Sequence, residues 1–161
     1  MAVLLYRVDE RLIHGQVVVG WGMRLQPDRI VVVDDELAAS DWEQELYTLG
    51  LPESIRASFE SVAHARAQLD GWIANPERIL LLTRDLTTMR RLAEDGALAG
   101  REVNIGGIHH AAGRDKVLPY VFLGPAEREE IHRLVDGGAL VVARDLPTAR
   151  AVDSAALMHG A

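Results

Sequence analysis

The chain contains no cysteine, which excludes disulfide bridges and thiolate nucleophiles. No apolar run approaches the ~20 residues that a membrane-spanning helix needs. In residues 1–7 no basic residue precedes the apolar run, and that run is too short for a signal peptide. We therefore expect a cytoplasmic protein that associates with a membrane only through its partners.

Positive charge is also scarce. The chain has 17 Lys and Arg against 24 Asp and Glu, a formal net charge of −7. Non-specific nucleic-acid binding and direct adhesion to an anionic membrane both depend on clustered basic charge, so neither is expected. Repeats, low-complexity tracts and linkers are absent as well, and 161 residues is the size of one domain. We predict a single domain over residues 1–161.

Short β-branched runs alternate with segments of helical periodicity, which is typical of an α/β fold with a mostly parallel sheet. We predict an open sheet of about seven strands with helices on both faces. The predicted strands are residues 3–8, 29–33, 55–59, 78–83, 103–105, 116–123 and 140–143. The predicted helices are residues 16–25, 41–49, 62–73, 86–95, 125–135 and 147–158.

Polar side chains follow several of these strands, among them Arg7, Asp34, Arg84, Asn104 and Arg144. The carboxyl ends of parallel strands meet at one edge of an open sheet. Ligands bind at that edge, where the strand order reverses. The pattern predicts a site assembled there.

The first of these strand ends carries the densest group of functional side chains, in residues 7–17. A strand that passes through a short polar loop into a helix exposes backbone N–H groups that favour an anion. Arg7 and Arg11 add planar cationic donors suited to phosphate, and His14 lies where the loop meets the helix. The residues are consistent with a phosphohistidine site, and equally with a capped helix start beside a solvated turn of ion pairs.

Under the first reading each neighbour of His14 has a role. Neutral imidazole is the nucleophile, and two guanidinium groups would favour that form and stabilise the transferring phosphoryl group. Gly15 would let backbone approach the phosphate. Gln16 is either an amide donor or a surface residue, and Asp9 either orients the loop by pairing with an arginine or is a plain turn acid.

The loop resembles the active-site loop of the enzyme IIB components of the mannose/fructose/sorbose family of the bacterial phosphotransferase system. The family pattern R-x-D-x-R-L-I-H-G-Q-V matches at Arg7, Asp9, Arg11, Leu12, Ile13, His14, Gly15, Gln16 and Val17. Residues 30–36 resemble the family's second strand and its acidic end, residues 104–107 its N-x-G-G segment, and residues 144–147 its R-x-x-P. Ile108, where the family often has methionine, is a departure outside the loop.

The resemblance implies a protein-N(pi)-phosphohistidine–sugar phosphotransferase. Such a component accepts a phosphoryl group from a phosphohistidine of a IIA partner onto His14, at Nδ1. It passes the group to a hexose delivered by the membrane components IIC and IID. Neither a metal nor an organic cofactor is implied. The sequence leaves the sugar and the oligomeric state open.

Other interpretations stay open at this point. A regulatory module of the same fold would sense phosphorylation without serving transport. A metal-dependent phosphatase-like hydrolase would use Asp34 and Asp35, but the D-x-D pattern is missing. A metal site at His109 and His110 lacks supporting ligand spacing.

Three further residues are candidates for supporting roles. Gly106 and Gly107 form either a mobile cover over the site or a tight turn. Arg144 is either a further phosphate ligand or a surface charge.

Overall fold

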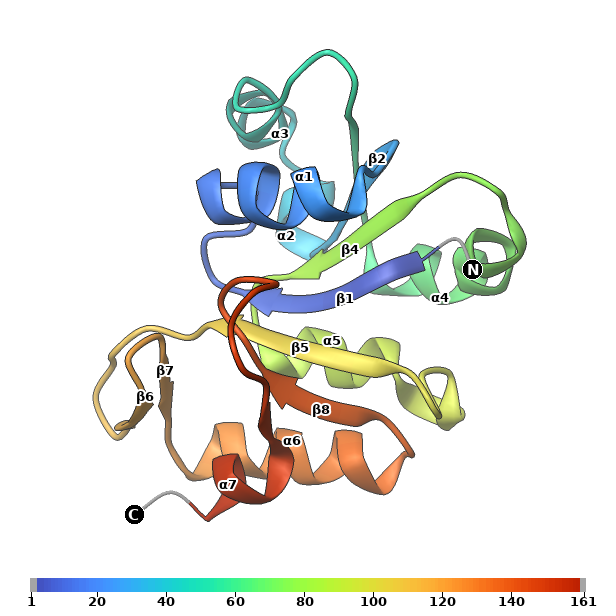
Figure 1. The fold of residues 1–161 in the computed structure, drawn as a ribbon. Helices are drawn as coiled ribbons and strands as arrows, with labels where there is room; N and C mark the ends of the chain where they lie inside the picture. The colour runs from blue at the N-terminus through green and yellow to red at the C-terminus, as the bar shows by residue number, and fades with distance from the viewer. Residues whose placement is uncertain (1–2, 160–161) are drawn as a thin grey trace.

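The computed structural model describes residues 3–159, which form one seven-stranded sheet in the order β3-β2-β4-β1-β5-β8-β9 (Figure 1). All neighbouring strands are parallel except β9, which runs antiparallel to β8 at one edge. The open, mostly parallel α/β fold is thus confirmed. The strands are β1 (Val3–Asp9), β2 (Arg29–Val33), β3 (Arg56–Glu60), β4 (Ile79–Thr83), β5 (Glu102–Gly107), β8 (Leu140–Ala143) and β9 (Val152–Asp153).

Helices cover both faces of this sheet. The first face carries η1 (Gln16–Trp21), α1 (Gly22–Leu25), α2 (Asp35–Ala38) and α3 (Asp41–Thr48). The second carries α4 (Val62–Ala74), α5 (Leu86–Leu92), α6 (Pro125–Asp136) and α7 (Ser154–Met158). A short 3₁₀ turn, η2 (Glu94–Gly96), follows α5.

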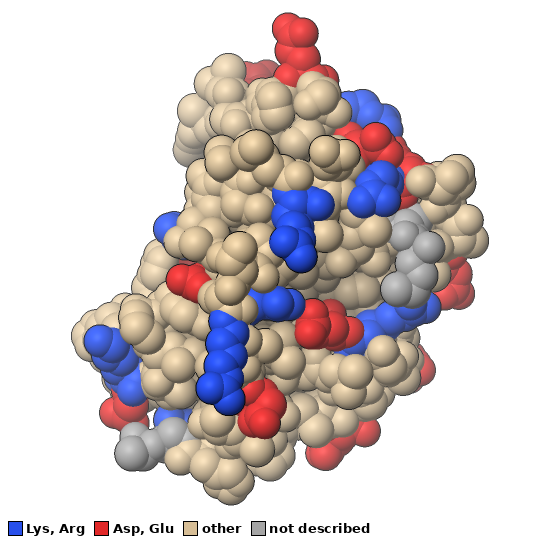
Figure 2. Space-filling model, viewed as in Figure 1, with Lys and Arg blue, Asp and Glu red and all other residues tan. Residues whose placement is uncertain are grey.

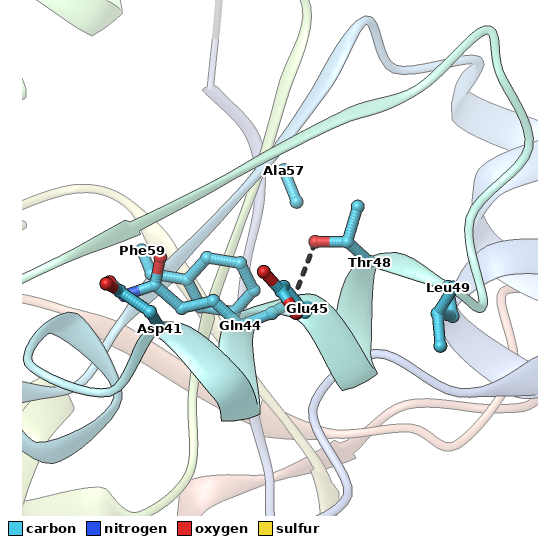
Figure 3. A pocket seen from close by; sticks show the side chains of 7 residues that line it. All are labelled: Asp41, Gln44, Glu45, Thr48, Leu49, Ala57 and Phe59. Carbon is cyan, nitrogen blue, oxygen red and sulfur yellow. Dashed lines mark hydrogen bonds between the residues drawn. The ribbon is translucent and has the colours of Figure 1, made fainter.

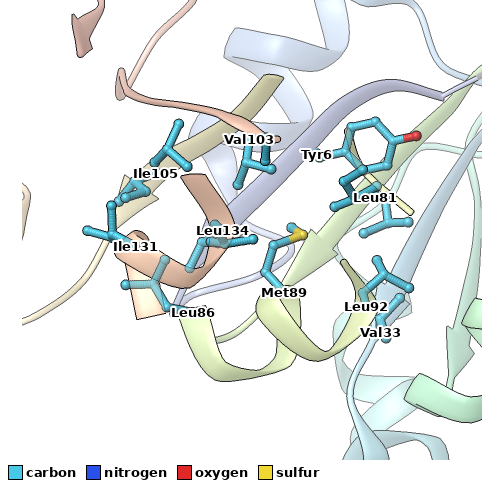
Figure 4. Close-up of a cluster of buried hydrophobic side chains, with 14 of the residues drawn as sticks. Tyr6, Val33, Leu81, Leu86, Met89, Leu92, Val103, Ile105, Ile131 and Leu134 are labelled. Atoms are coloured by element: carbon cyan, nitrogen blue, oxygen red, sulfur yellow. The ribbon is translucent and has the colours of Figure 1, made fainter. Parts of the chain in front are cut away.

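The central strands are apolar on both sides because each side meets a layer of helices. In β2, Ile30 and Val32 pack on the first face, whereas Val31 and Val33 pack on the second. Figure 4 shows the second cluster, in which side chains of α5 and α6 such as Met89 and Leu134 meet Leu81 and other strand residues. These strands hold β1 at the centre of the sheet.

The predicted strand 116–123 is wrong. The segment folds as a two-stranded antiparallel hairpin, β6 (Asp115–Leu118) and β7 (Val121–Leu123), outside the main sheet. Pro119 lies in the turn between them. A proline has no N–H for a strand ladder, and here it ends one strand and reverses the chain.

The predicted helix 147–158 is also wrong in its first half. Residues 144–151 form an irregular segment, and Val152 pairs with Ala143 in β9 before α7 begins. Asp153 caps α7 by accepting a hydrogen bond from the N–H of Ala156 at 3.1 Å. The backbone carbonyls of residues 144 and 145 bind a buried side chain of β1, described below.

The helix after β1 differs from the single α-helix predicted for residues 16–25. Val17 and Val18 both donate to the carbonyl of His14 at 3.0 and 2.9 Å, and the π-helix η1 then closes with the N–H of Gly22 donating to the carbonyl of Val17, five residues back. Gly20 lies against Leu146, 2.8 Å from where a Cβ atom would stand. The π-helix η1 therefore packs directly against the 144–151 segment.

Tyr6 provides a test of the core. Burial raises the pKa of its hydroxyl group to about 12, although the charge of Arg101 acts the other way. The hydroxyl oxygen has no hydrogen-bond partner within residues 3–159. The folded state holds the phenol proton more tightly than the unfolded chain. This contribution to stability is therefore complete below pH ~10 and is lost as the pH rises from there toward 12.

We expect Tyr6→Phe to change the free energy of unfolding at pH 7 by less than ~1 kcal/mol. Above pH ~10 the wild type should lose roughly 2–3 kcal/mol of its free energy of unfolding as Tyr6 ionises, and the variant should not show this loss. Urea unfolding at a series of pH values measures both effects. Tyr47→Phe, at a half-buried tyrosine of α3, is the matched control and should keep the wild-type decline.

Candidate functional site at the carboxyl end of β1

The loop after β1 is shaped by Asp9. Its Oδ1 accepts a hydrogen bond from the N–H of Arg11 at 3.0 Å, and its carbonyl accepts one from the N–H of Leu12 at 2.9 Å. Leu12 has a φ of 55°, the left-handed region that costs a non-glycine residue on the order of 1 kcal/mol. Its side chain is fully buried in the core of the first face, which holds this conformation. The tight turn brings residue 14 back over the end of the strand.

His14 is held by the same carboxylate. Its Nε2 lies 2.9 Å from Asp9 Oδ2, and 15% of its side chain is exposed. A carboxylate can only accept, so Nε2 carries the ring proton in this contact. No hydrogen bond occupies Nδ1 among the described residues. The arrangement leaves Nδ1 with its lone pair as the available nitrogen.

The ionised state of Asp9 follows from its surroundings. Burial alone would raise the pKa of this carboxyl group. The hydrogen bond with His14, the charge of Arg7 and the N–H of Arg11 outweigh burial and hold that pKa below its ordinary value. The group that contacts the imidazole is therefore a carboxylate, rather than a guanidinium as the sequence suggested.

Arg7 does not reach the surface, contrary to its predicted role as a phosphate ligand. Its side chain is fully buried. Nη1 donates to Asn104 Oδ1 at 2.8 Å and to the carbonyl of Arg144 at 2.9 Å. Nη2 donates to Asp9 Oδ2 and to the carbonyl of Asp145, both at 3.1 Å. With these donors engaged, Arg7 buttresses Asp9 and holds the 144–151 segment against the sheet.

Arg11, Gly15 and Gln16 lie together beside His14, where the sequence placed them. The Arg11 side chain is 41% exposed, and its Nη2 donates to Gln16 Oε1 at 2.7 Å. Gly15 is exposed with open space around its Cα. Arg11 therefore provides an accessible cation at the mouth of the site, and Gln16 orients it.

Gly106 and Gly107 form neither a mobile cover nor a tight turn. Both are buried within β5. A Cβ atom at Gly106 would overlap the guanidinium carbon of Arg7, and one at Gly107 would lie 3.0 Å from Asp9 Oδ1. The glycines leave room for the two charged side chains of β1 to lie flat on the neighbouring strand.

The Arg144 side chain does not join His14. Its guanidinium lies 5.4 Å from the ring of Trp21 and 3.8 Å from a carboxylate oxygen of Glu102. Its backbone carbonyl is the part that serves the site, through Arg7. Trp21 supports the same segment by donating from Nε1 to the carbonyl of Asp145 at 2.9 Å.

Sequence reasoning placed Asn104 at the ligand-binding edge of the sheet without assigning it a partner, and it missed Trp21 as a member of this network. An asparagine inside an apolar strand run was a usable signal, because a fully buried amide requires a partner. The other candidates have structural partners. Asp34 caps α2 by accepting a hydrogen bond from the N–H of Leu37. Asp35 accepts a hydrogen bond from the N–H of Val62 and forms an ion pair with Arg91.

The two adjacent histidines diverge. His109 lies 3.1 Å from Glu10, and His110 packs edge-on against Phe122. Within residues 3–159 no three histidine or carboxylate groups are placed to bind one metal ion.

Taken together, these features define an α/β domain whose polar site lies at the carboxyl end of the central strand, beside the reversal of strand order. Residues 3–161 match the family model of the PTS system sorbose subfamily IIB component. The chain belongs to this family, whose members are phosphotransferase components of sugar transport systems.

Known proteins agree with this assignment. The chain is 28% identical to the N-acetylgalactosamine-specific phosphotransferase enzyme IIB component 1 of Escherichia coli, covering 90% of this chain and 91% of that protein. It is 32% identical to the mannose-specific EIIAB component of E. coli, covering 92% of this chain but only 46% of that longer protein.

Solved structures share the fold. The IIBSor domain of the sorbose permease from Klebsiella pneumoniae superposes with a TM-score of 0.87 at 22% identity, covering 100% of this chain and 99% of that one. The N-acetylgalactosamine-specific IIB component 1 from E. coli gives a TM-score of 0.85 at 27% identity, covering 94% and 98%. Among the described residues, no helix is both long and apolar enough to cross a membrane.

Gly106 tests the buried network. We expect Gly106→Ala to destabilise the protein by at least ~2–3 kcal/mol, because the new methyl group displaces a buried guanidinium from its acceptors. Gly71→Ala is the control, since that glycine lies in α4 with no atom within 4 Å of the added Cβ. It should stabilise by ~0.5–1 kcal/mol. Urea unfolding compares the two, and equal stability of the Gly106 variant and wild type would contradict this account.

Proposed function

We propose that His14 is the phosphorylated residue of this IIB component. In this proposal His14 accepts a phosphoryl group from a phosphohistidine of a IIA partner. It then transfers the group to a hexose delivered by the membrane components IIC and IID. The observation that carries the proposal is the contact of Asp9 with Nε2, which leaves Nδ1 free at a partly exposed position beside Arg11.

The chemistry follows from that geometry. The Nδ1 lone pair forms a bond to phosphorus while the bond from phosphorus to the donor's ring nitrogen breaks. The donor ring keeps that electron pair and takes up a proton. As Nδ1 bonds to phosphorus, positive charge develops on the His14 ring, and the Asp9 carboxylate stabilises it through the Nε2 proton. Arg11 and the backbone N–H groups at the start of the helix would stabilise the equatorial oxygens.

In the second half of the cycle a sugar hydroxyl oxygen attacks phosphorus, and His14 leaves as the neutral ring with its proton still on Nε2. The hydroxyl proton passes to solvent or to a base of the sugar-binding partner. The longer EIIAB relative supports a IIA partner, because its name joins the two components in one chain. Names of relatives specific for mannose, fructose, sorbose and N-acetylgalactosamine support a hexose or an amino sugar as acceptor.

His14→Ala tests the phosphorylation site. Incubation with the general phosphotransferase enzymes, the IIA partner and labelled phosphoenolpyruvate should label the wild type and leave the variant unlabelled. His109→Ala, which removes a 58% exposed histidine close to the same loop, should be labelled like the wild type. Full labelling of His14→Ala would end this proposal. Arg11→Ala should lower the labelling rate by on the order of 10²-fold.

Asp9→Asn tests how the ring is held. In the wild type, ¹⁵N NMR of the His14 ring should show the proton on Nε2, and the phosphorylated form should carry the phosphoryl group on Nδ1. The variant should populate both tautomers and lose ~10²–10⁴-fold in phosphorylation rate. Glu10→Gln changes the adjacent acid, which pairs with Arg114, and should keep both the tautomer and the rate. An unchanged tautomer in Asp9→Asn would show that another group orients the ring.

A further inference from the structure

The net charge of the chain is concentrated in one segment. Residues 34–55 contain seven of the 24 acidic residues and no lysine or arginine, which leaves 17 acidic against 17 basic residues in the rest of the chain. This segment comprises α2, α3 and the loop that leads into β3. The formal charges of the rest of the chain therefore sum to zero, and the net charge of −7 equals that of this one segment.

The same flank exposes apolar side chains. Trp42, Leu46 and Leu49 are 65%, 58% and 82% exposed, and their spacing places them on one side of α3. We name these three residues the apolar stripe. α3 has no fully buried residue, although Tyr47 reaches inward to the ring of Phe59. The stripe points away from the sheet, and none of the described residues covers it.

Acidic side chains border the stripe on both sides. Helical geometry places Glu43 on one side of it and Asp41 with Glu45 on the other. None of these three carboxylates forms an ion pair with another described residue, unlike Asp35, which pairs with Arg91 of α5. The charges on α3 thus have no partner within the described chain.

A groove beside the stripe extends this surface. It lies between α3 and β3, the edge strand of the sheet, and Gln44 and Thr48 face Ala57 and Phe59 across it (Figure 3). The described residues pair β3 on one side only, with β2.

The loop that follows α3 also meets the helix that follows His14. Val19 and Met23 are 57% and 73% exposed on η1 and α1. Met23 lines one hollow together with Pro52 and Ser54 of the loop that follows α3. Figure 2 shows a broad, largely uncharged area where α1 and α3 lie in Figure 1, with acidic side chains at its upper margin. Apolar area of this kind on a protein surface marks an interaction site.

We infer that the apolar stripe and its acidic border are the docking surface for a cytoplasmic segment of the membrane components IIC and IID. This inference rests on the proposed function, which requires such a partner. Cytoplasmic loops of membrane proteins carry an excess of lysine and arginine. A basic, partly apolar loop complements a surface that is apolar at its centre and acidic at its rim, and the attraction directs the acidic flank toward the membrane partner.

Nanodiscs that contain the IIC–IID pair of this protein's own transport system provide the test, with empty nanodiscs as the blank. We expect Trp42→Ser and Leu46→Ser to weaken binding roughly tenfold or more. Leu140→Ser is the matched control, because Leu140 is 59% exposed but lies on β8, toward the edge of the sheet opposite β3. It should bind like the wild type.

A second variant tests the charge. The double change Glu43→Gln and Glu45→Gln should weaken binding and reduce its dependence on salt. Asp70→Asn, which removes an exposed carboxylate of α4, is the control and should leave both unchanged. Labelling of His14 by the IIA partner should be the same in all these variants, because the stripe lies outside the proposed phosphorylation site.

Several outcomes would overturn the inference. The first is that Trp42→Ser and Leu46→Ser bind the IIC–IID nanodiscs as tightly as the wild type does. Another is a loss of labelling by the IIA partner with nanodisc binding intact, which would assign the stripe to the donor. A dimer of the wild type that Leu46→Ser dissociates, again with nanodisc binding intact, would assign it to a second copy. Failure of His14 labelling in the wild type would instead end the proposed function. The nanodisc measurement distinguishes that failure from a failure of the docking inference.

Discussion

A single buried carboxylate organises the functional end of this protein. Asp9 binds the guanidinium of Arg7, the ring of His14 and the N–H of Arg11 at the same time. An ionised carboxylate out of contact with water is stable only when its oxygens are satisfied by donors, and here both are. The shape of the loop, the orientation of the imidazole and the anchoring of a distant segment all depend on that requirement.

Arg7 extends this requirement across the molecule. A buried guanidinium needs acceptors in its plane, and two of them are carbonyls of residues 144 and 145, on the segment that crosses from β8 to β9. Its remaining acceptor besides Asp9 is Asn104 of β5. The neighbouring strand carries glycine at position 106, since any side chain there would occupy the space of the guanidinium. One ion pair therefore constrains two further parts of the chain, β5 and the segment that follows β8.

The exterior separates into two functional parts in our proposal. Around His14 the surface offers an accessible arginine, which suits a phosphoryl group that arrives and leaves repeatedly. The flank at α3 carries carboxylates without ion-pair partners among the described residues beside an apolar stripe, which suits longer contact with a basic partner. A carrier that meets two partners in turn gains from keeping the transfer site and the docking surface adjacent but distinct.

The sequence alone determined the layers of the fold and the neighbourhood of the site. Apolar runs such as residues 30–33 predict strands buried on both faces, and the spacing of Arg11, His14 and Gln16 brings them together because a loop into a helix is a local structure. Only the tertiary structure decided that Arg7 is internal, that Gly106 and Gly107 make room for charged side chains, and that residues 147–151 do not form a helix. Those outcomes arise from long-range hydrogen bonds of Arg7. Its bond to Asn104 joins residues that are 97 positions apart in the sequence, and its bond to the carbonyl of Arg144 joins residues that are 137 positions apart. No local pattern encodes such contacts. A buried cation takes whatever acceptors the folded chain brings to it, so its role follows from long-range packing rather than from its place in a motif.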